Sequence, residues 1–172
     1  MNFIDKLSEK LGDLAFKLAG IILIYMVLHI VYEITLRAFF SSSTYVLDEF
    51  VAYGTAGLTF LCMAKSMRNK TLIRVGIVLD RLSGLPRLIM EATSLSITLF
   101  LSWYIIYFFW FNIFWRNIMR GRVSESIAEI PLWIPESFVM IGLLLFSFQV
   151  LVMLIKVLVN GIGEHEELTQ AD

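Results

Sequence analysis

The chain has 172 residues, of which 58% are hydrophobic and only 17% are charged, and its mean hydropathy is +0.77. A soluble domain carries about a quarter of charged residues, so this composition excludes an ordinary soluble protein. The net charge of −1 argues against attraction to nucleic acid, and a single cysteine, Cys62, excludes an internal disulfide and a cysteine-based zinc site.

Four long stretches lack any charged side chain, at residues 18–32, 50–64, 92–115 and 137–155. A helix rises about 1.5 Å per residue, so about 20 apolar residues cross a hydrocarbon core of about 30 Å. The sequence therefore predicts an all-α integral membrane protein with one membrane domain over residues 1–172. Its four transmembrane helices are expected at approximately 18–38, 48–65, 88–115 and 135–157.

The N-terminal segment 3–17 places apolar residues at steps of three and four, with charged residues between them. This spacing predicts an amphipathic helix that lies in the membrane interface and leads directly into the first span. Gly12 and Gly20 are the bend points that such a change of direction would use. In the alternative interpretation, the same helix extends the first span into water.

Two ionisable side chains, Glu33 and Arg37, stand near the end of the first span, four residues apart and hence on one helix face. An ionisable group inside a membrane is a functional candidate, so this is a candidate intramembrane pair. We expect local pairing or docking of a partner, and proton or substrate coupling is the alternative. His29, in the same span, is expected to find a hydrogen-bond partner inside the bundle.

Asp48 and Glu49 stand immediately before the second apolar stretch. Carboxylates at that position favour the positive end of the helix dipole, so N-terminal capping explains them. The sharper hypothesis is that they dock another subunit at the outer surface of the membrane.

The connection between the second and third spans is rich in basic residues, which are Lys65, Arg68, Lys70, Arg74, Arg81 and Arg87. With three lysines in the N-terminal segment and Lys156, one side of the membrane carries ten basic residues, against four on the other. The positive-inside rule then predicts cytoplasmic N- and C-termini.

Residues 72–83 within this connection predict a short cytoplasmic interfacial helix, with a collapsed loop as the alternative. Its apolar face would meet lipid or a neighbouring protein. The residues expected to contact phospholipid or that protein are Lys65, Arg68, Lys70, Arg74 and Arg81.

The third span is unusually aromatic in its second half, with ten aromatic residues between positions 100 and 115. They surround the helix, which indicates a broad surface that faces lipid or a partner rather than a seam within the bundle. Trp103 and Trp110 are seven residues apart and share a face, so they are candidates for partner docking. We expect the C-terminal tail 161–172 to be disordered.

Chemical motifs are scarce. The only histidines are His29 and His165, too few for a bis-histidine haem or a histidine-rich metal site. No nucleophile elbow, phosphate-binding loop or zinc-protease motif occurs. We therefore expect no cofactor, no metal and no enzymatic activity.

Several short motifs follow one another in a characteristic order: EITLR at 33–37, DEF at 48–50, MRNKTLIRV at 67–75 with LDRL at 79–82, and PLWIP at 131–135. In this order, over about residues 14–158, the chain resembles the small membrane subunit of tripartite ATP-independent periplasmic (TRAP) transporters. The resemblance implies a four-helix scaffold in the bacterial inner membrane.

Its implied partners are a large transport subunit and a periplasmic substrate-binding protein. In such systems the binding protein captures an organic acid, and the large subunit moves it inward with a sodium gradient. Overall likeness suggests the sialic acid (N-acetylneuraminate) branch.

Two other functions stay open at this point. Small multidrug exporters also have four spans and a membrane glutamate in the first, which would be Glu33 here. They are shorter, with tight loops, and their glutamate has no neighbouring arginine. The other alternative is a non-catalytic membrane anchor subunit of an enzyme complex.

Overall fold

The computed structural model describes residues 2–69, 85–125, 127 and 129–160. Four long helices make up most of this part: α1 (Asn2–Phe40), α2 (Leu47–Arg68), α4 (Leu85–Phe109) and α6 (Trp133–Asn160). α4 continues through a π-helical turn, η1 (Trp110–Phe114), into the short helix α5 (Trp115–Met119). The described residues form no strand, only an isolated bridge between Val123 and Pro131, so the prediction of an all-α protein is confirmed.

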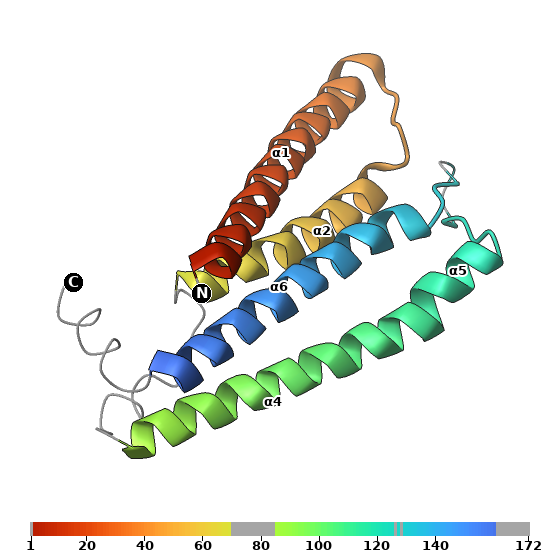
Figure 1. Ribbon diagram of the computed structural model, residues 1–172. Coiled ribbons are helices and arrows are strands. Elements are labelled where there is room, and N and C mark those ends of the chain that lie inside the picture. Colours follow the sequence, from red (N-terminus) through yellow and green to blue (C-terminus); the bar gives the residue numbers. More distant parts are fainter. Residues whose placement is uncertain (1, 70–84, 126, 128, 161–172) are drawn as a thin grey trace.

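The four long helices lie in one row, in the order α1, α2, α6, α4 (Figure 1). α2 packs against α1 on one side and α6 on the other, and α6 in turn packs against α4. α1 and α4 therefore form the two edges of the row. We call the end of the bundle near the N-terminus of α1 the Asp5 end, and the end where α1 finishes the Glu33 end.

Apolar contacts fill each seam of the row. Ala15 and Ala19 of α1 pack on Leu61 of α2, where small side chains let the two backbones approach closely. Between α6 and α4, Met140 and Leu143 contact Ile106. A third cluster joins α2, α4 and α6 through Met67, Leu95, Phe146, Val150 and Val157.

The α2–α6 seam is the tightest at Gly142. A Cβ atom added there would lie 2.5 Å from the backbone carbonyl carbon of Phe60, closer than real Cβ contacts allow. Glycine is therefore required at this position because only its hydrogen fits against the neighbouring backbone.

Three helical segments are long and apolar enough to cross a membrane: Ile4–Phe40, Pro86–Met119 and Trp133–Val159. They agree with the first, third and fourth predicted spans. α2 is not among them, because two glycines and two threonines lower its hydropathy and charged residues stand at both of its ends. A fourth span in α2 stays a prediction.

The segment 3–17 leads directly into the first span, as expected, and its placement in the membrane interface stays a prediction. α1 is one continuous helix of 39 residues, and neither Gly12 nor Gly20 interrupts it. The polar face of its first half is turned toward α2 and α6 and bonds to their side chains, which removes the reason for it to leave the bundle.

Other boundaries also shift. The third predicted span ends at residue 115, whereas the helical path continues through α5 to Met119. The predicted helix 72–83, with Lys70, Arg74 and Arg81, and the tail 161–172 lie outside the described residues.

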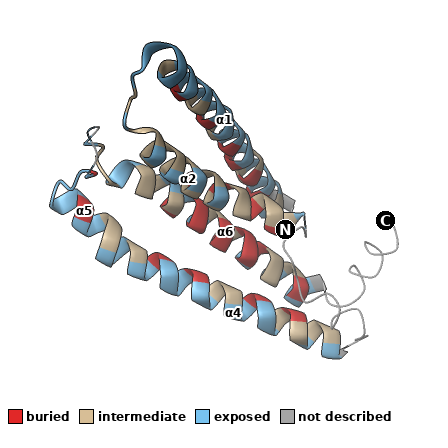
Figure 2. Cartoon of the chain, turned by 180° about the vertical axis from the view of Figure 1, so that it is seen from behind, coloured by how far each residue is buried: buried red, intermediate tan, exposed pale blue. Residues whose placement is uncertain are grey.

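Figure 2 shows how unevenly the helices are buried, with buried residues concentrated along α6 and exposed residues along α4 and α1. Each of the three spans has a most apolar stretch of 18 residues. The share of that stretch that is buried is 44% in α6, 17% in α1 and 11% in the span that begins with α4. α6 is therefore the most buried helix of the fold, although the other helices do not surround it completely.

Candidate functional site

Glu33 is the most buried charged side chain of the described residues, with 1% of its surface exposed. Its Oε1 accepts a hydrogen bond from Arg37 Nε at 2.8 Å and another from Ser43 Oγ. Its Oε2 accepts from the backbone N–H and the hydroxyl of Thr44, at 3.1 and 2.6 Å. Both oxygens of the carboxylate are thus satisfied by the chain itself. We call Glu33, Arg37, Ser43 and Thr44 the Glu33 cluster.

The Glu33 cluster holds the connection between α1 and α2 in place. Ser41 and Tyr45 take left-handed backbone conformations, with φ of 47° and 58°. Ser43 Oγ also receives hydrogen bonds from Arg37 and from the backbone N–H of Tyr45, both at 3.2 Å. The buried carboxylate therefore pins a short loop whose strained residues would otherwise be costly to hold.

Spacing alone predicted the contact of Glu33 with Arg37, and the loop hydroxyls were missed. The available signal was the run of four hydroxyl residues at 41–44, immediately after the helix. Such residues bond readily to nearby acceptors.

Asp48 and Glu49 lie in the first turn of α2, close to the Glu33 cluster in the chain. The expected capping hydrogen bond is wrong, because the N-cap residue is Val46 and no side chain caps the helix. Glu49 instead accepts a hydrogen bond from the phenol of Tyr53 at 2.8 Å, while Asp48 is exposed. Their position still suits the positive end of the helix dipole.

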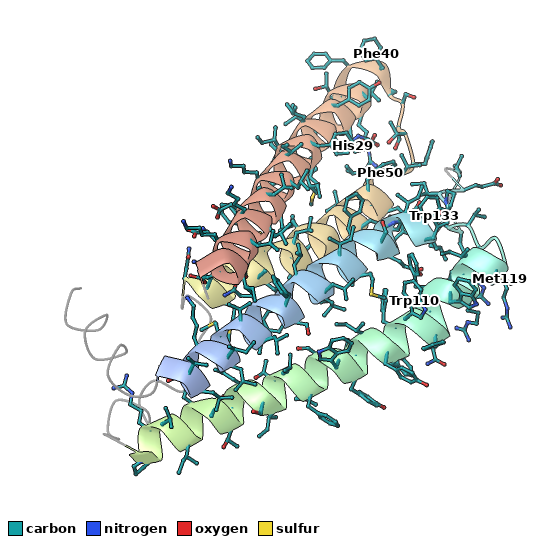
Figure 3. The ribbon with its side chains drawn as sticks, viewed as in Figure 1. His29, Phe40, Phe50, Trp110, Met119 and Trp133 are labelled. Carbon is teal, nitrogen blue, oxygen red and sulfur yellow. The ribbon has the colours of Figure 1, made fainter. Side chains whose placement is uncertain are left out.

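His29 stacks on Tyr25 and lies against Phe50, with ring centroids 5.8 and 5.4 Å apart (Figure 3). Its Nε2 is buried without a hydrogen-bond partner, so the expected bond inside the bundle does not form from this atom. The physical reason is the environment, since the two neighbouring rings present faces rather than acceptors.

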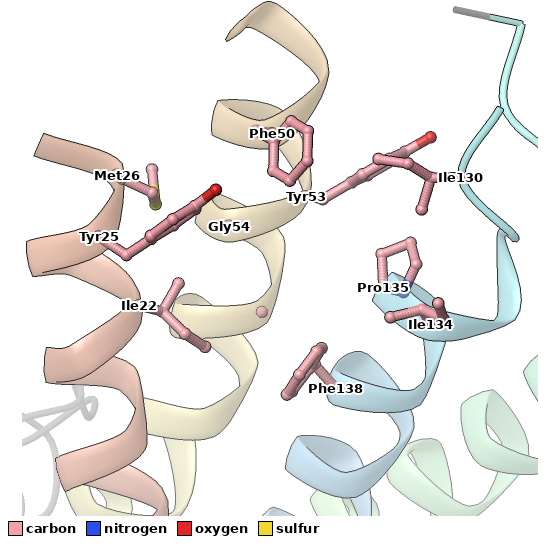
Figure 4. Close-up of a pocket in the computed structure, with 11 residues that line it drawn as sticks. Ile22, Tyr25, Met26, Phe50, Tyr53, Gly54, Ile130, Ile134, Pro135 and Phe138 are labelled. Carbon is pink, nitrogen blue, oxygen red and sulfur yellow. The ribbon is translucent and has the colours of Figure 1, made fainter. Parts of the chain in front are cut away.

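An apolar cavity of about 160 Å³ lies below this aromatic group, between α1, α2 and the start of α6 (Figure 4). No charged residue lines it. The lining residues are Ile22, Tyr25, Met26, Phe50, Tyr53, Gly54, Gly57, Ile130, Ile134, Pro135 and Phe138. A charged organic acid would lose its hydration there without compensation.

The Asp5 end of the bundle is held by ion pairs between helices. Arg68 contacts Asp5 at 3.0 Å and Glu9 at 3.2 Å, and Lys156 contacts Asp5 at 2.8 Å. Lys65 pairs with Asp13 in the same way. Two of the basic residues predicted to face lipid, Lys65 and Arg68, are thus engaged with the acidic face of α1.

Trp103 and Trp110 lie on the opposite edge of the row, in α4 and η1, with 57% and 39% of their surfaces exposed. Trp110 contacts the rings of Phe114 and Trp115, at centroid distances of 5.3 and 6.4 Å. α6 separates this aromatic edge from Asp48 and Glu49, so the predicted docking residues fall on two different surfaces.

Hydroxyl side chains in the helices bond mainly to their own backbone, to the carbonyl four residues earlier. This is the case for Thr35, Thr55, Thr59, Thr93, Ser96, Thr98 and Ser102. They are satisfied without forming a polar path between helices. Within the described part of the chain, no three side chains of the kinds that bind metals come together.

A second polar contact was missed in the sequence. Near the Glu33 end, Asn117 of α5 donates a hydrogen bond to Glu136 of α6. Nothing in the sequence spacing links these residues, which are 19 positions apart and meet only because the fold brings Asn117 of α5 to the first turn of α6.

The fold defines a small helical membrane protein, and its described residues form no cluster that could hold a metal ion. A family model described as "Tripartite ATP-independent periplasmic transporters, DctQ component" matches residues 26–160. The chain belongs to this family, which confirms the resemblance seen in its motifs. It is therefore the small component of a TRAP transporter rather than a member of an enzyme family. No curated protein and no solved structure matched the chain.

Proposed function

We propose that this chain is the scaffold subunit of a sodium-coupled TRAP importer in the bacterial inner membrane. A periplasmic binding protein delivers an organic acid anion, and sialic acid is the substrate we favour. The large membrane subunit moves the solute, and the present chain supports and orients it.

The observation that carries this proposal is the aromatic edge of α4. Trp103, Tyr104, Tyr107 and Phe108 are each at least half exposed, although they stand in the middle of a long apolar helix. Buried tryptophan and tyrosine side chains are frequent anchors of protein interfaces. We assign this edge to the large subunit.

The interior of the bundle supports a scaffold rather than a transporter acting alone. A charged solute needs polar partners near the middle of the membrane. The cavity between α1, α2 and the start of α6 is apolar, and the carboxylate of Glu33 is saturated by Arg37, Ser43 and Thr44. This saturation also argues against a proton exporter built on Glu33.

We place both termini in the cytoplasm and α2 across the membrane as a fourth span, so that residues 1–172 form one membrane domain. The Asp5 end then faces the cytoplasm, where basic residues also meet phospholipid headgroups, and the Glu33 end faces the periplasm. A single cysteine at position 69 in a Cys62→Ser background tests this orientation. Labelling by an impermeant reagent from the periplasmic side would contradict it.

The direct test of function is reconstitution in liposomes with a sodium gradient and labelled sialic acid. We expect no uptake by this chain alone, and uptake when the large subunit and the loaded binding protein are added. Uptake by the purified chain alone would overturn the scaffold assignment.

Asp48 and Glu49 are our candidates for contact with the binding protein at the periplasmic surface. Exposed carboxylates steer association with basic patches and change its rate more than its final strength. The double variant Asp48→Lys/Glu49→Lys should therefore slow transport mainly when the binding protein is limiting. An equal loss at saturating binding protein would instead point to a defect within the membrane complex.

A further inference from the structure

The contact between Asn117 and Glu136 sits where α5 lies against the first turns of α6. Asn117 is only 6% exposed, although Arg116 and Ile118 on either side of it are exposed. The π-helical turn η1 precedes it and adds a residue to the helix, which rotates everything that follows by about 100° relative to a regular α-helix. This register shift is what turns Asn117 toward α6.

Two acceptor atoms at this contact lack a donor. Asn117 Nδ2 donates to Glu136 Oε1, while Asn117 Oδ1 and Glu136 Oε2 are both buried without a hydrogen-bond partner. A buried acceptor without a donor is unfavourable, and a buried carboxylate charge without a counter-ion is more so. Both unpaired acceptor atoms thus belong to the two side chains that already share one hydrogen bond.

One proton would remove both defects. A proton on Glu136 Oε2 cancels the charge and supplies a donor, and Asn117 Oδ1 is the unused acceptor of the facing amide. A carboxylic acid and a primary amide can then form two parallel hydrogen bonds, each group donating once and accepting once. We propose that Glu136 is a proton-binding site, held neutral at about pH 7 in an acid–amide pair with Asn117.

The surroundings favour the neutral form. Glu136 forms no ion pair within the described part of the chain, and the cavity of about 170 Å³ beside it is otherwise lined by apolar side chains and Tyr53. The titratable groups facing it from α2 are Tyr53 and, through the phenol of Tyr53, Glu49.

The start of α6 does not offer Glu136 the usual helix N-terminal donors. The backbone N–H groups of Ile134 and Glu136 bond to the carbonyls of Pro131 and Leu132, and Pro135 has no N–H group. A metal ion or a partner's cation would need access to the two orphan oxygens, and both are sealed from solvent. A proton is the one ligand that requires no additional room.

This inference does not depend on the transport assignment. It makes the acid–amide pair a clamp between α5 and α6 that weakens when Glu136 loses its proton. Because the folded state keeps a proton that the unfolded chain has already released, the clamp's contribution to stability should fall as the pH rises.

Isotope-edited infrared spectroscopy of the full chain in liposomes tests the protonation state directly. With ¹³C-labelled glutamate, the wild type minus Glu136→Gln difference spectrum at about pH 7 should contain the carbonyl band of a protonated carboxyl group. A carboxylate band attributable to Glu136 in that spectrum would overturn the proposal.

Thermal unfolding against pH gives the second readout. Glutamine preserves the shape and both hydrogen bonds of the neutral pair, so Glu136→Gln should melt at the wild-type temperature below about pH 4, where the unfolded carboxyl group is protonated too, and above the wild-type temperature near neutral pH. The wild type should then lose thermal stability as the pH rises, and the Glu136→Gln variant should show a shallower slope. Equal slopes in the two proteins, or a large loss in Glu136→Gln at neutral pH, would contradict a protonated Glu136.

Discussion

The two edge helices of the row, α1 and α4, are alike in burial and different in chemistry. α1 packs mainly on α2 and also touches α6, α4 packs on α6, and each leaves most of its apolar surface outside the bundle. The exposed face of α1 is largely aliphatic, with Ile21, Ile24 and Leu28, whereas that of α4 carries Trp103 and Tyr107. Aliphatic side chains suit lipid tails, and large rings in mid-helix suit a protein surface.

The contacts that hold α1 and α4 to the rest of the bundle also differ in chemistry. α1 is fastened by ion pairs at the Asp5 end and by the Glu33 cluster at the other. α4 and α5 contact α6 through apolar side chains and through the hydrogen bond of Asn117 to Glu136. The subunit therefore fixes α1 with its own polar groups and leaves α4 with unused contact surface. From this contrast we propose that α1 faces lipid and α4 faces the large subunit.

The sharpest test of this contrast is the double variant Trp103→Ala/Trp110→Ala. If both rings are buried against the large subunit, each should contribute about 2 kcal/mol or more, so their loss should largely abolish co-purification of that subunit. The variant chain itself should insert and fold, because neither ring belongs to the buried clusters of the bundle.

The matched control is Ile21→Ala/Leu28→Ala on α1, which removes exposed apolar side chains that are also seven residues apart. It should leave the complex intact. Equal loss of the large subunit from both double variants, or from neither, would remove the distinction between the two edges.

The next largest effect is expected at Gly142, in the contact between the two central helices α2 and α6. Gly142→Ala forces a Cβ against the backbone of Phe60, so α2 and α6 must separate, at a cost of about 1–3 kcal/mol. Thermal unfolding of the purified chain in detergent measures this loss.

Gly54→Ala is the control for Gly142→Ala, because the atoms nearest to its new Cβ are Sδ and Cγ of the Met26 side chain rather than backbone atoms. A flexible methionine can move aside, so this variant should be nearly neutral. A larger loss from Gly54→Ala than from Gly142→Ala would mean that the α1–α2 seam, rather than α2–α6, is the tight one.

Those features of the fold that depend on local pattern could be predicted from the sequence. Long uncharged runs specify α4 and α6 without knowledge of their neighbours, and spacing of four specifies the contact of Glu33 with Arg37. The sequence also suggested the family, because the order of short motifs survives without any three-dimensional information.

What could not be predicted depends on residues far apart in the chain. The charged face of 3–17 was assigned to the membrane interface, but its partners Lys65 and Arg68 stand 52 and 63 positions away from Asp13 and Asp5. The register shift at η1 likewise has no local signal, because it is the packing of α5 on α6 that gives Asn117 a buried partner.

A smaller effect is expected at the Glu33 cluster. Glu33→Gln keeps an acceptor for Thr44 but loses the charge that attracts Arg37, so it should loosen the α1–α2 loop without abolishing transport. Transport by the reconstituted complex, with Arg37→Gln as the matched variant, provides the measurement. If Glu33→Gln stopped transport while Arg37→Gln did not, a proton-coupling role for Glu33 would replace the structural one.

The smallest effect should come from the ion pairs at the Asp5 end. Arg68 and Asp5 are about one-fifth and one-quarter exposed, so their pair is partly screened and should contribute under about 1 kcal/mol. A double-mutant cycle with Asp5→Asn and Arg68→Gln isolates this coupling energy in thermal unfolding, and added salt should reduce it. Arg68→Lys should retain part of it, because the charge remains while the forked geometry that reaches both Asp5 and Glu9 is lost.

A zero coupling energy at low salt would show that apolar packing of Ala15 and Ala19 on Leu61, rather than charge, holds α1 to the row. The two edges would then be attached by the same kind of force, and only their exposed faces would distinguish them.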